Sequence, residues 1–229
     1  EVQAAINRIQ SVEDTRRTIE NLRSIGIASI NIDILYGLPL QTEARLISTV
    51  AEVVKLAPDR AALFGYAHVP WMKKHQSMIR DDDLPGDTER ARHAAVAADQ
   101  LVAAGYVRIG LDHFSKPADS MALAAATGTL HRNFQGYTTD DCSVLLGFGA
   151  SAISRFSGGF VQSIVPTAQY EACIREGRLP HARGIVLSDD DKIRGWMIER
   201  LMCDMALSRS ELDCAFPGHA EAYWKLVRN

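Results

Sequence analysis

A segment near the middle of the chain, residues 130–139, combines residue types that bind ligands. LHRNFQGYTT contains a basic pair, two amides, two aromatic rings and a glycine, with little helical or strand periodicity. Phe134 and Tyr137 can stack on a planar group, and Gln135 or Asn133 can hydrogen-bond to that group. The alternative is a connecting loop in which Phe134 only fills the core. Because an aperiodic segment of this composition is hard to explain as scaffold, we interpret it as a ligand-facing loop.

Asp33 is a second candidate, because it lies inside the apolar run Ile27–Leu35. An ionised carboxylate in a buried strand costs on the order of several kcal/mol unless it is paired or hydrogen-bonded. A structural pair with Asn31 or with an arginine of a neighbouring helix would satisfy it. A ligand contact would satisfy it equally well, and the residues by themselves leave both interpretations open.

Two further segments carry weaker signals. HVPWMKKHQSMIR gathers His68, Lys73, Lys74, His75 and Arg80. These cations suit an anionic ligand, but a solvated charged loop is the simpler interpretation. GFGASAIS lacks the third glycine and the following helix of a phosphate-binding loop. Its Ile153 could pack against an adenine ring or, as is commoner for isoleucine, against the core.

The elements that position these residues repeat a strand, loop and helix order. The spacing predicts helices over residues 15–24, from Thr42 to about Ala57, and from Asp87 to Gly105. Strands are predicted at Ile27–Leu35, at Arg60–Ala67 and in YVRIGLDHF. This alternation is typical of βαβ units in a parallel sheet or barrel. Three units are too few to close a barrel, so we expect further strands from a missing N-terminal half.

The texture of the sequence changes after Pro166. Segments around residues 170–175 and from Ser188 onward show helical periodicity. We therefore predict an α/β domain over residues 1–165 and the start of a mostly helical domain over residues 166–229.

Composition excludes several classes of protein. The 229 residues carry a formal net charge of -3 and contain no apolar run long enough for a membrane span. Nucleic acid is therefore not an expected partner, and we expect a cytoplasmic location. The four cysteines, Cys142, Cys173, Cys203 and Cys214, lack the tight spacing of metal or cluster sites. We expect no metal ligands in this chain.

Taken together, NIDILYGLPLQT, FGYAHVPWMKKHQ, GLDHFSKP, LHRNFQGYTT and GFGASAIS resemble the oxygen-independent coproporphyrinogen III oxidases of the radical S-adenosylmethionine (SAM) superfamily. The resemblance implies the C-terminal half of a partial (β/α)6 barrel followed by a truncated helical domain. It also implies oxidative decarboxylation of two propionates of coproporphyrinogen III to vinyls through a SAM-derived 5'-deoxyadenosyl radical. The product is protoporphyrinogen IX, in haem biosynthesis.

The resemblance also assigns roles to single residues. Arg8, Asp33 and Ala67 match family positions that contact a second SAM. Ile153 matches one that contacts the cluster-bound SAM, and Phe134 and Gln135 match residues needed for activity. Two molecules of SAM and a 4Fe-4S cluster are therefore the implied cofactors, with the cluster cysteines expected upstream of Glu1.

The partners implied are a tetrapyrrole substrate and an electron donor for the cluster, and the fragment alone is expected to be inactive. Two alternatives stay open. One is a haem-binding, haem-trafficking relative on the same barrel without oxidase activity. The other is an aldolase-like α/β barrel that never held a cluster.

Overall fold

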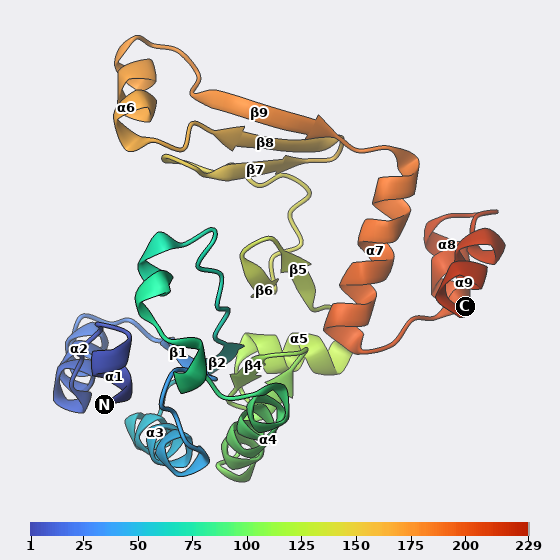
Figure 1. Ribbon diagram of the computed structural model, residues 1–229. Coiled ribbons are helices and arrows are strands. Elements are labelled where there is room, and N and C mark those ends of the chain that lie inside the picture. The colour runs from blue at the N-terminus through green and yellow to red at the C-terminus, as the bar shows by residue number, and fades with distance from the viewer. Residues whose placement is uncertain (229) are drawn as a thin grey trace. The chain divides into compact units, whose positions relative to one another are not determined.

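The computed structural model describes the backbone of residues 1–228 and side chains up to residue 225. The chain divides into two compact units, Glu1–Leu130 and His131–Asn229. Each unit has its own sheet and helices, visible by colour and label in Figure 1. The two units are described separately below as unit 1 and unit 2.

Unit 1 is built on a four-stranded sheet in the order β1-β2-β4-β3. The strands are β1 (Asn31–Tyr36), β2 (Arg60–Gly65), β3 (Val107–Ile109) and β4 (His113–Ser115). The helices are α1 (Val2–Ala5), α2 (Val12–Ser24), α3 (Glu43–Leu56), α4 (Asp87–Ala103) and α5 (Ser120–Thr127), with short 3-10 turns at Lys74–Met78 and Asp81–Asp83. Strands β1 and β2 are parallel, as the βαβ pattern predicts.

Local sequence signals set most helix starts in unit 1. The Ser11 side chain accepts a hydrogen bond from the Asp14 backbone N–H at the start of α2, at 3.0 Å. Thr42 caps α3 in the same way. The helix predicted from Asp87 is α4: Gly86 is its N-cap, and Asp87 is the first helical residue, where its negative charge is stabilised by the positive end of the helix.

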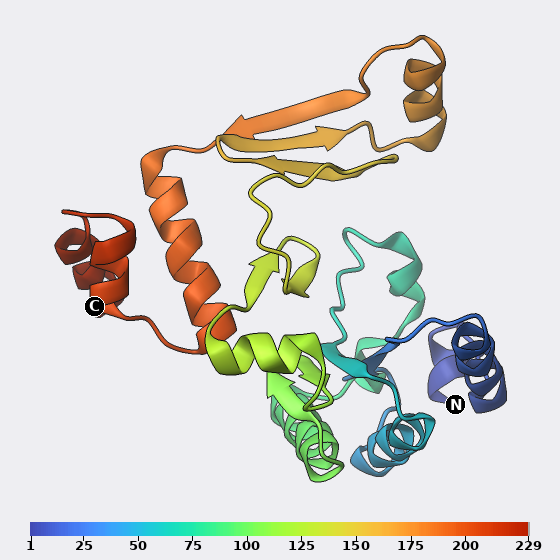
Figure 2. The same cartoon turned by 180° about the vertical axis from the view of Figure 1, so that it is seen from behind.

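The core of unit 1 lies between one face of the sheet and helices α3 and α4. These two helices run side by side in both views (Figures 1 and 2). Leu46 and Val50 of α3, Ala97 and Leu101 of α4, and Phe114 of β4 are all almost fully buried there. The spacing of four residues between Leu46 and Val50, and between Ala97 and Leu101, places each pair on one face of its helix.

The strand predicted over YVRIGLDHF is instead two short strands. The chain turns at Gly110, whose φ is 56°, and β3 and β4 pair antiparallel, with Ile109 opposite His113. Strand β4 then pairs antiparallel with β2. A tight turn can only join antiparallel neighbours, because a parallel return needs a long crossover. The parallel pattern therefore holds for β1 and β2 but not for this third unit.

Unit 2 contains a two-stranded hairpin and a three-stranded antiparallel sheet. The strands are β5 (His131–Asn133), β6 (Gly136–Thr138), β7 (Ile153–Phe156), β8 (Gly159–Ser163) and β9 (His181–Val186). Helix α6 (Thr167–Arg175) connects β8 to β9 and lies at one end of their sheet (Figure 1). Since β9 pairs with β8, a strand occupies part of the segment predicted to be helical after Pro166, and the predicted boundary at residue 165 falls within the span of this sheet.

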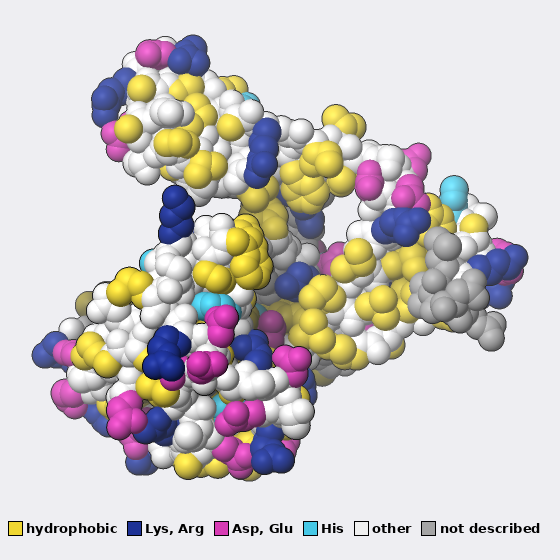
Figure 3. Space-filling view, viewed as in Figure 1, with side chains coloured by type: hydrophobic (Ala, Val, Ile, Leu, Met, Phe, Trp, Pro, Cys, Tyr) yellow, Lys and Arg dark blue, Asp and Glu magenta, His cyan; other side chains and the backbone are white. Residues whose placement is uncertain are grey.

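The part of unit 2 that follows β9 carries helices, as the sequence predicts from Ser188 onward: α7 (Asp189–Asp204), α8 (Arg209–Ala215) and α9 (Ala220–Arg228). Ser188 and Asp191 form a capping box that starts α7. Ile193 and Met197 of α7 pack with Leu212 and Ala220 in a small core. Hydrophobic side chains also gather on the surface of this helical part (Figure 3), where Ile198 and other apolar residues are exposed.

Candidate functional site

The predicted ligand-facing loop is the β5-β6 hairpin. His131 lies opposite Thr138, Arg132 opposite Tyr137 and Asn133 opposite Gly136, so Phe134 and Gln135 occupy the two turn positions. The Asn133 side chain accepts a hydrogen bond from the Gln135 backbone N–H at 2.8 Å, and Gly136 has a φ of 142°, which favours glycine. The turn therefore presents both predicted residues outward: Phe134 is 43% exposed, and Gln135 is exposed.

Helix α7 holds this hairpin from the other side. The Glu199 carboxylate accepts hydrogen bonds from His131 Nδ1 at 2.9 Å and from the Arg132 backbone N–H at 3.2 Å. The Tyr137 hydroxyl donates to the Met202 carbonyl oxygen at 3.0 Å. These bonds join residues more than sixty positions apart, which is why no local pattern predicted Glu199.

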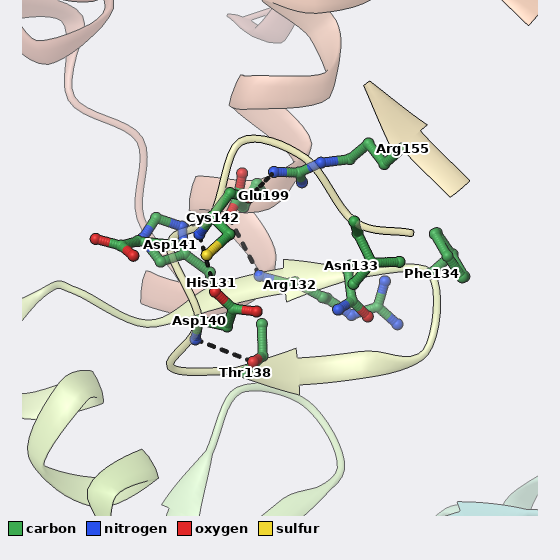
Figure 4. A pocket seen from close by; sticks show the side chains of 11 residues that line it. His131, Arg132, Asn133, Phe134, Thr138, Asp140, Asp141, Cys142, Arg155 and Glu199 are labelled. Carbon is green, nitrogen blue, oxygen red and sulfur yellow. Dashed lines mark hydrogen bonds and ion pairs between the residues drawn. The ribbon is translucent and has the colours of Figure 1, made fainter. Parts of the chain in front are cut away.

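A charged pocket of about 180 Å³ opens beside the hairpin (Figure 4). Its lining comes from the hairpin, the following loop, β7 and α7: His131, Arg132, Asn133, Phe134, Thr138, Asp140, Asp141, Cys142, Leu145, Arg155 and Glu199. Of the six residues that the sequence singled out, Phe134 lines this pocket directly. The ring of Phe134 also meets Phe160 of β8 edge to face, with centroids 6.4 Å apart.

Hydrogen bonds fix the loop that closes the charged pocket. The Cys142 backbone N–H donates to Asp140 at 2.9 Å, and the Asp140 N–H donates to the Thr138 hydroxyl at 3.0 Å. The backbone and side-chain hydrogen bonds from Cys142 lower the pKa of Asp140. The same contact raises the pKa of the Cys142 thiol, because the neighbouring carboxylate opposes a thiolate.

Ile153 begins strand β7, opposite Gln162 of β8, and is half-buried. Its backbone lies so close to Gly147 that a Cβ on that glycine would meet the Ile153 carbonyl oxygen at 2.7 Å. Gly147 therefore allows strand β7 of the same chain to approach its backbone closely. The structure places Ile153 in unit 2, on the strand that also carries Arg155.

Arg8, Asp33 and Ala67 all lie in unit 1 and are exposed. The expectation that Asp33 is buried on both faces of a strand is wrong for the described chain, because only the face of β1 that carries Ile34 is buried. The Asn31 amide donates to Asp33 Oδ1 at 2.7 Å, so the predicted Asn31 pair is present. The other carboxylate oxygen accepts no hydrogen bond from residues 1–225, and the Asp33 side chain is exposed.

The basic loop after β2 is ordered by Gln76, a residue that sequence reasoning missed. Its amide donates to the Ala67 carbonyl oxygen at 3.1 Å and accepts from the Val69 N–H at 2.6 Å. His68 lies between the Tyr66 hydroxyl, 3.1 Å away, and Asp81, 3.2 Å away. Gln76 is therefore the residue that shapes the backbone around Ala67.

The cysteines do not form a cluster site. Cys173 and Cys203 are buried and Cys142 and Cys214 exposed. Over residues 1–225, the only grouping with metal-ligand spacing is Asp140, Asp141 and Cys142. Its members are all exposed and partly used in the loop's own hydrogen bonds, so no set of three thiolates suited to a 4Fe-4S cluster is present there. In the described part of the chain, no helix is long and apolar enough to cross a membrane.

Comparisons with known proteins relate the whole chain to one group. It is 49% identical over 96% of its length to an oxygen-independent coproporphyrinogen III oxidase of Cereibacter sphaeroides, covering 49% of that protein. It is 50% identical over 98% of its length to one of Bradyrhizobium diazoefficiens, covering 50% of it. No protein-family model matches the chain.

Among solved structures, the chain matches coproporphyrinogen III oxidase from Escherichia coli, described as a radical SAM enzyme. The TM-score is 0.90 at 38% identity, with 98% of this chain and 52% of that one covered. The α/β fold predicted from the sequence is confirmed by this match. The chain thus spans about half the length of the relatives it matches.

Proposed function

Because the chain belongs by sequence and fold to the oxygen-independent coproporphyrinogen III oxidases, which are radical SAM enzymes, we propose that it is the part of such an oxidase that presents Phe134 and Gln135 to the active site. The reaction proposed is the oxidative decarboxylation of two propionates of coproporphyrinogen III to vinyl groups, giving protoporphyrinogen IX. We place it in haem biosynthesis and in the cytoplasm. A separate electron donor would reduce the cluster.

The observation that carries this proposal is the exposed turn of the β5-β6 hairpin. Phe134 and Gln135 protrude from a hairpin that Asn133 orders internally and that Glu199 anchors to α7. Preorganised presentation of an aromatic ring and an amide suits the orientation of a planar ligand, because little conformational freedom is then lost on binding. Core packing alone does not explain why these hydrogen bonds order a turn whose two side chains are exposed.

Unit 1 fits part of a SAM site. One carboxylate oxygen of Asp33 accepts from the Asn31 amide, and within residues 1–225 no donor bonds to the other, so that oxygen can accept from an ammonium or ribose hydroxyl. The small, exposed Ala67 leaves room for an adenosyl group. With Arg8, these are the residues that we propose hold a second SAM, and Ile153 would contact the cluster-bound SAM.

SAM, when bound to a reduced 4Fe-4S cluster, supplies the radical that removes hydrogen from the substrate. The four cysteines of this chain are not grouped as ligands of a 4Fe-4S cluster would be. We propose that the cluster ligands lie outside the 229 residues. We therefore expect the 229-residue chain alone to bind no stable cluster and to show no turnover. Iron content and anaerobic oxidase activity of the purified chain test this expectation.

The site proposal is tested with Gln135→Leu in an enzyme that contains this chain together with its cluster-binding part. The variant should keep the cluster absorption spectrum of the wild type and lose vinyl formation, because leucine matches the size of glutamine but cannot hydrogen-bond. Glu176→Gln, at the exposed end of α6, is a matched surface control. Wild-type rates for Gln135→Leu would remove the hairpin turn from the active site.

A haem-binding relative without oxidase activity is the second candidate. The same preparation distinguishes it, because tight haem binding without decarboxylation of coproporphyrinogen would favour that function.

A further inference from the structure

A second, larger hollow in unit 2 runs along the hairpin, and we call it the aromatic groove. It measures about 560 Å³, within the usual range for small-molecule sites. Its apolar wall includes Phe134, Phe160, Trp196, Met202 and Phe216, and its charged residues are Arg132, Arg155, Asp191, Lys192 and Glu199. Flat rings and cations therefore line the same space.

The carboxylates of the aromatic groove are already occupied by donors of the protein. Asp191 accepts from both the backbone N–H and the hydroxyl of Ser188 in the capping box. Glu199 accepts from His131 and from the Arg132 backbone N–H. Lys192 is neutralised by Asp189 at 2.8 Å. These groups have little capacity left for an external charge.

The two arginines differ from those carboxylates. Arg132 lies over the Tyr137 ring, 5.5 Å from its centroid, and its Nε is buried without a hydrogen-bond partner. The Arg155 guanidinium donates to the Cys142 carbonyl oxygen, at 3.2 Å. Within residues 1–225 neither guanidinium is within ion-pair distance of a carboxylate. Asp140 is near Arg155 but is held by the Cys142 N–H.

A buried polar atom without a partner is costly, and an arginine without an anion leaves unused donors in a fixed planar fork. Both arginines line the charged pocket as well as the aromatic groove, so they stand where the two hollows share their lining. An anion held there by either guanidinium would leave an attached ring system beside the aromatic wall.

We propose that Arg132 and Arg155 bind a propionate carboxylate of the tetrapyrrole, with the pyrrole rings lying against Phe134, Phe160 and Trp196. This inference rests on the proposed function, since it names the groups that recognise the substrate. The methionine carboxylate of SAM has the same chemistry, so the experiment must separate the two sources.

The test uses the enzyme containing this chain and its cluster-binding part, with Arg132→Gln and Arg155→Gln. Coproporphyrin III, a fluorescent tetracarboxylate, is titrated into each variant, and SAM binding is measured separately by calorimetry. Each substitution should raise the Kd for coproporphyrin about tenfold, as expected for one lost charge-assisted contact, and leave the Kd for SAM unchanged. Arg183→Gln on β9, which is exposed and outside this lining, is the matched control and should change neither.

The lysine variants guard against a purely structural effect. Arg132→Lys and Arg155→Lys should recover part of the affinity, because charge is kept while bidentate geometry is lost. Melting temperatures show whether each variant is folded, and higher salt should weaken wild-type binding more than binding to the glutamine variants.

Unchanged coproporphyrin affinity in both folded glutamine variants would overturn the proposal, and so would a raised Kd for SAM alone. The proposed function fails separately. Arginine-dependent coproporphyrin binding without vinyl formation by the wild type would refute the oxidase and leave the carboxylate subsite standing. Normal vinyl formation with arginine-independent binding would refute the subsite only.

Discussion

Removing the Glu199 carboxylate should loosen the hairpin that presents Phe134 and Gln135. In Glu199→Ala the Arg132 backbone N–H and His131 Nδ1 both lose their acceptor, whereas Arg200, 3.6 Å from Glu199, keeps its closer pair with Asp204 at 3.0 Å. The hydrogen bond from a backbone N–H to a charged group contributes about 1.5–3 kcal/mol. The His131 side chain is 39% exposed. Because solvent screens its contact with Glu199, we reduce the contribution of this contact to about 0.5–1 kcal/mol. The expected total cost is about 2–4 kcal/mol.

Urea unfolding measures this cost. Trp71 lies in unit 1 and is 76% exposed, so a Trp71→Phe background leaves Trp196 and Trp224 as reporters of unit 2. Glu199→Ala should then lower the free energy of unfolding of unit 2 by the stated amount with little change in the m-value. In the hairpin itself, the Arg132 amide should exchange its hydrogen faster.

A double-mutant cycle with His131→Ala isolates the side-chain pair, and the coupling energy should be about 0.5–1 kcal/mol. Glu171→Ala, which breaks an exposed pair with Arg175 on α6, is the matched control and should cost no more than about 0.5 kcal/mol. If Glu199→Ala also costs less than about 0.5 kcal/mol and the coupling is near zero, α7 does not anchor the hairpin and the reasoning is refuted.

Two further predictions concern unit 2. A Cβ at Gly159 would overlap the Ile185 carbonyl oxygen across the β8-β9 pair, whereas a Cβ at Gly158 would meet nothing within 4 Å. Gly159→Ala should therefore lower the free energy of unfolding by about 1–3 kcal/mol more than Gly158→Ala. Equal costs of the two substitutions in urea unfolding would contradict the strand packing described. Asp140 raises the pKa of the exposed Cys142 thiol. Asp140→Asn should therefore lower that pKa, increase the thiolate fraction near pH 8 and speed alkylation of Cys142. Peptide mass spectrometry measures the alkylation rate, and an unchanged or slower rate would show that the carboxylate does not control the reactivity of this thiol.

The sequence by itself determined the local elements. The helices predicted over residues 15–24, from Thr42, from Asp87 and from Ser188 onward are present in the structure, because capping and apolar spacing are signals that act within a few residues. The parallel pair β1 and β2 also followed from the alternation of elements. Motif resemblance identified the family, which the comparisons bear out.

Tertiary structure decided what depends on distant partners. The reversal at Gly110 turned one predicted strand into a hairpin, since a short stretch of nine residues cannot show whether its two ends pair with each other. The exposure of Asp33 depends on which face of β1 the helices cover.

The candidate site shows the same division. The residue types of LHRNFQGYTT marked it as a ligand-facing segment, and resemblance selected Phe134 and Gln135. Only the folded chain brought Glu199 of α7 to the hairpin and, among residues 1–225, left Arg132 and Arg155 without a carboxylate at ion-pair distance. Tertiary packing decides which distant segments share hydrogen bonds and which charges are paired. Such long-range contacts produce no periodic pattern in the sequence, so they could not be predicted from it.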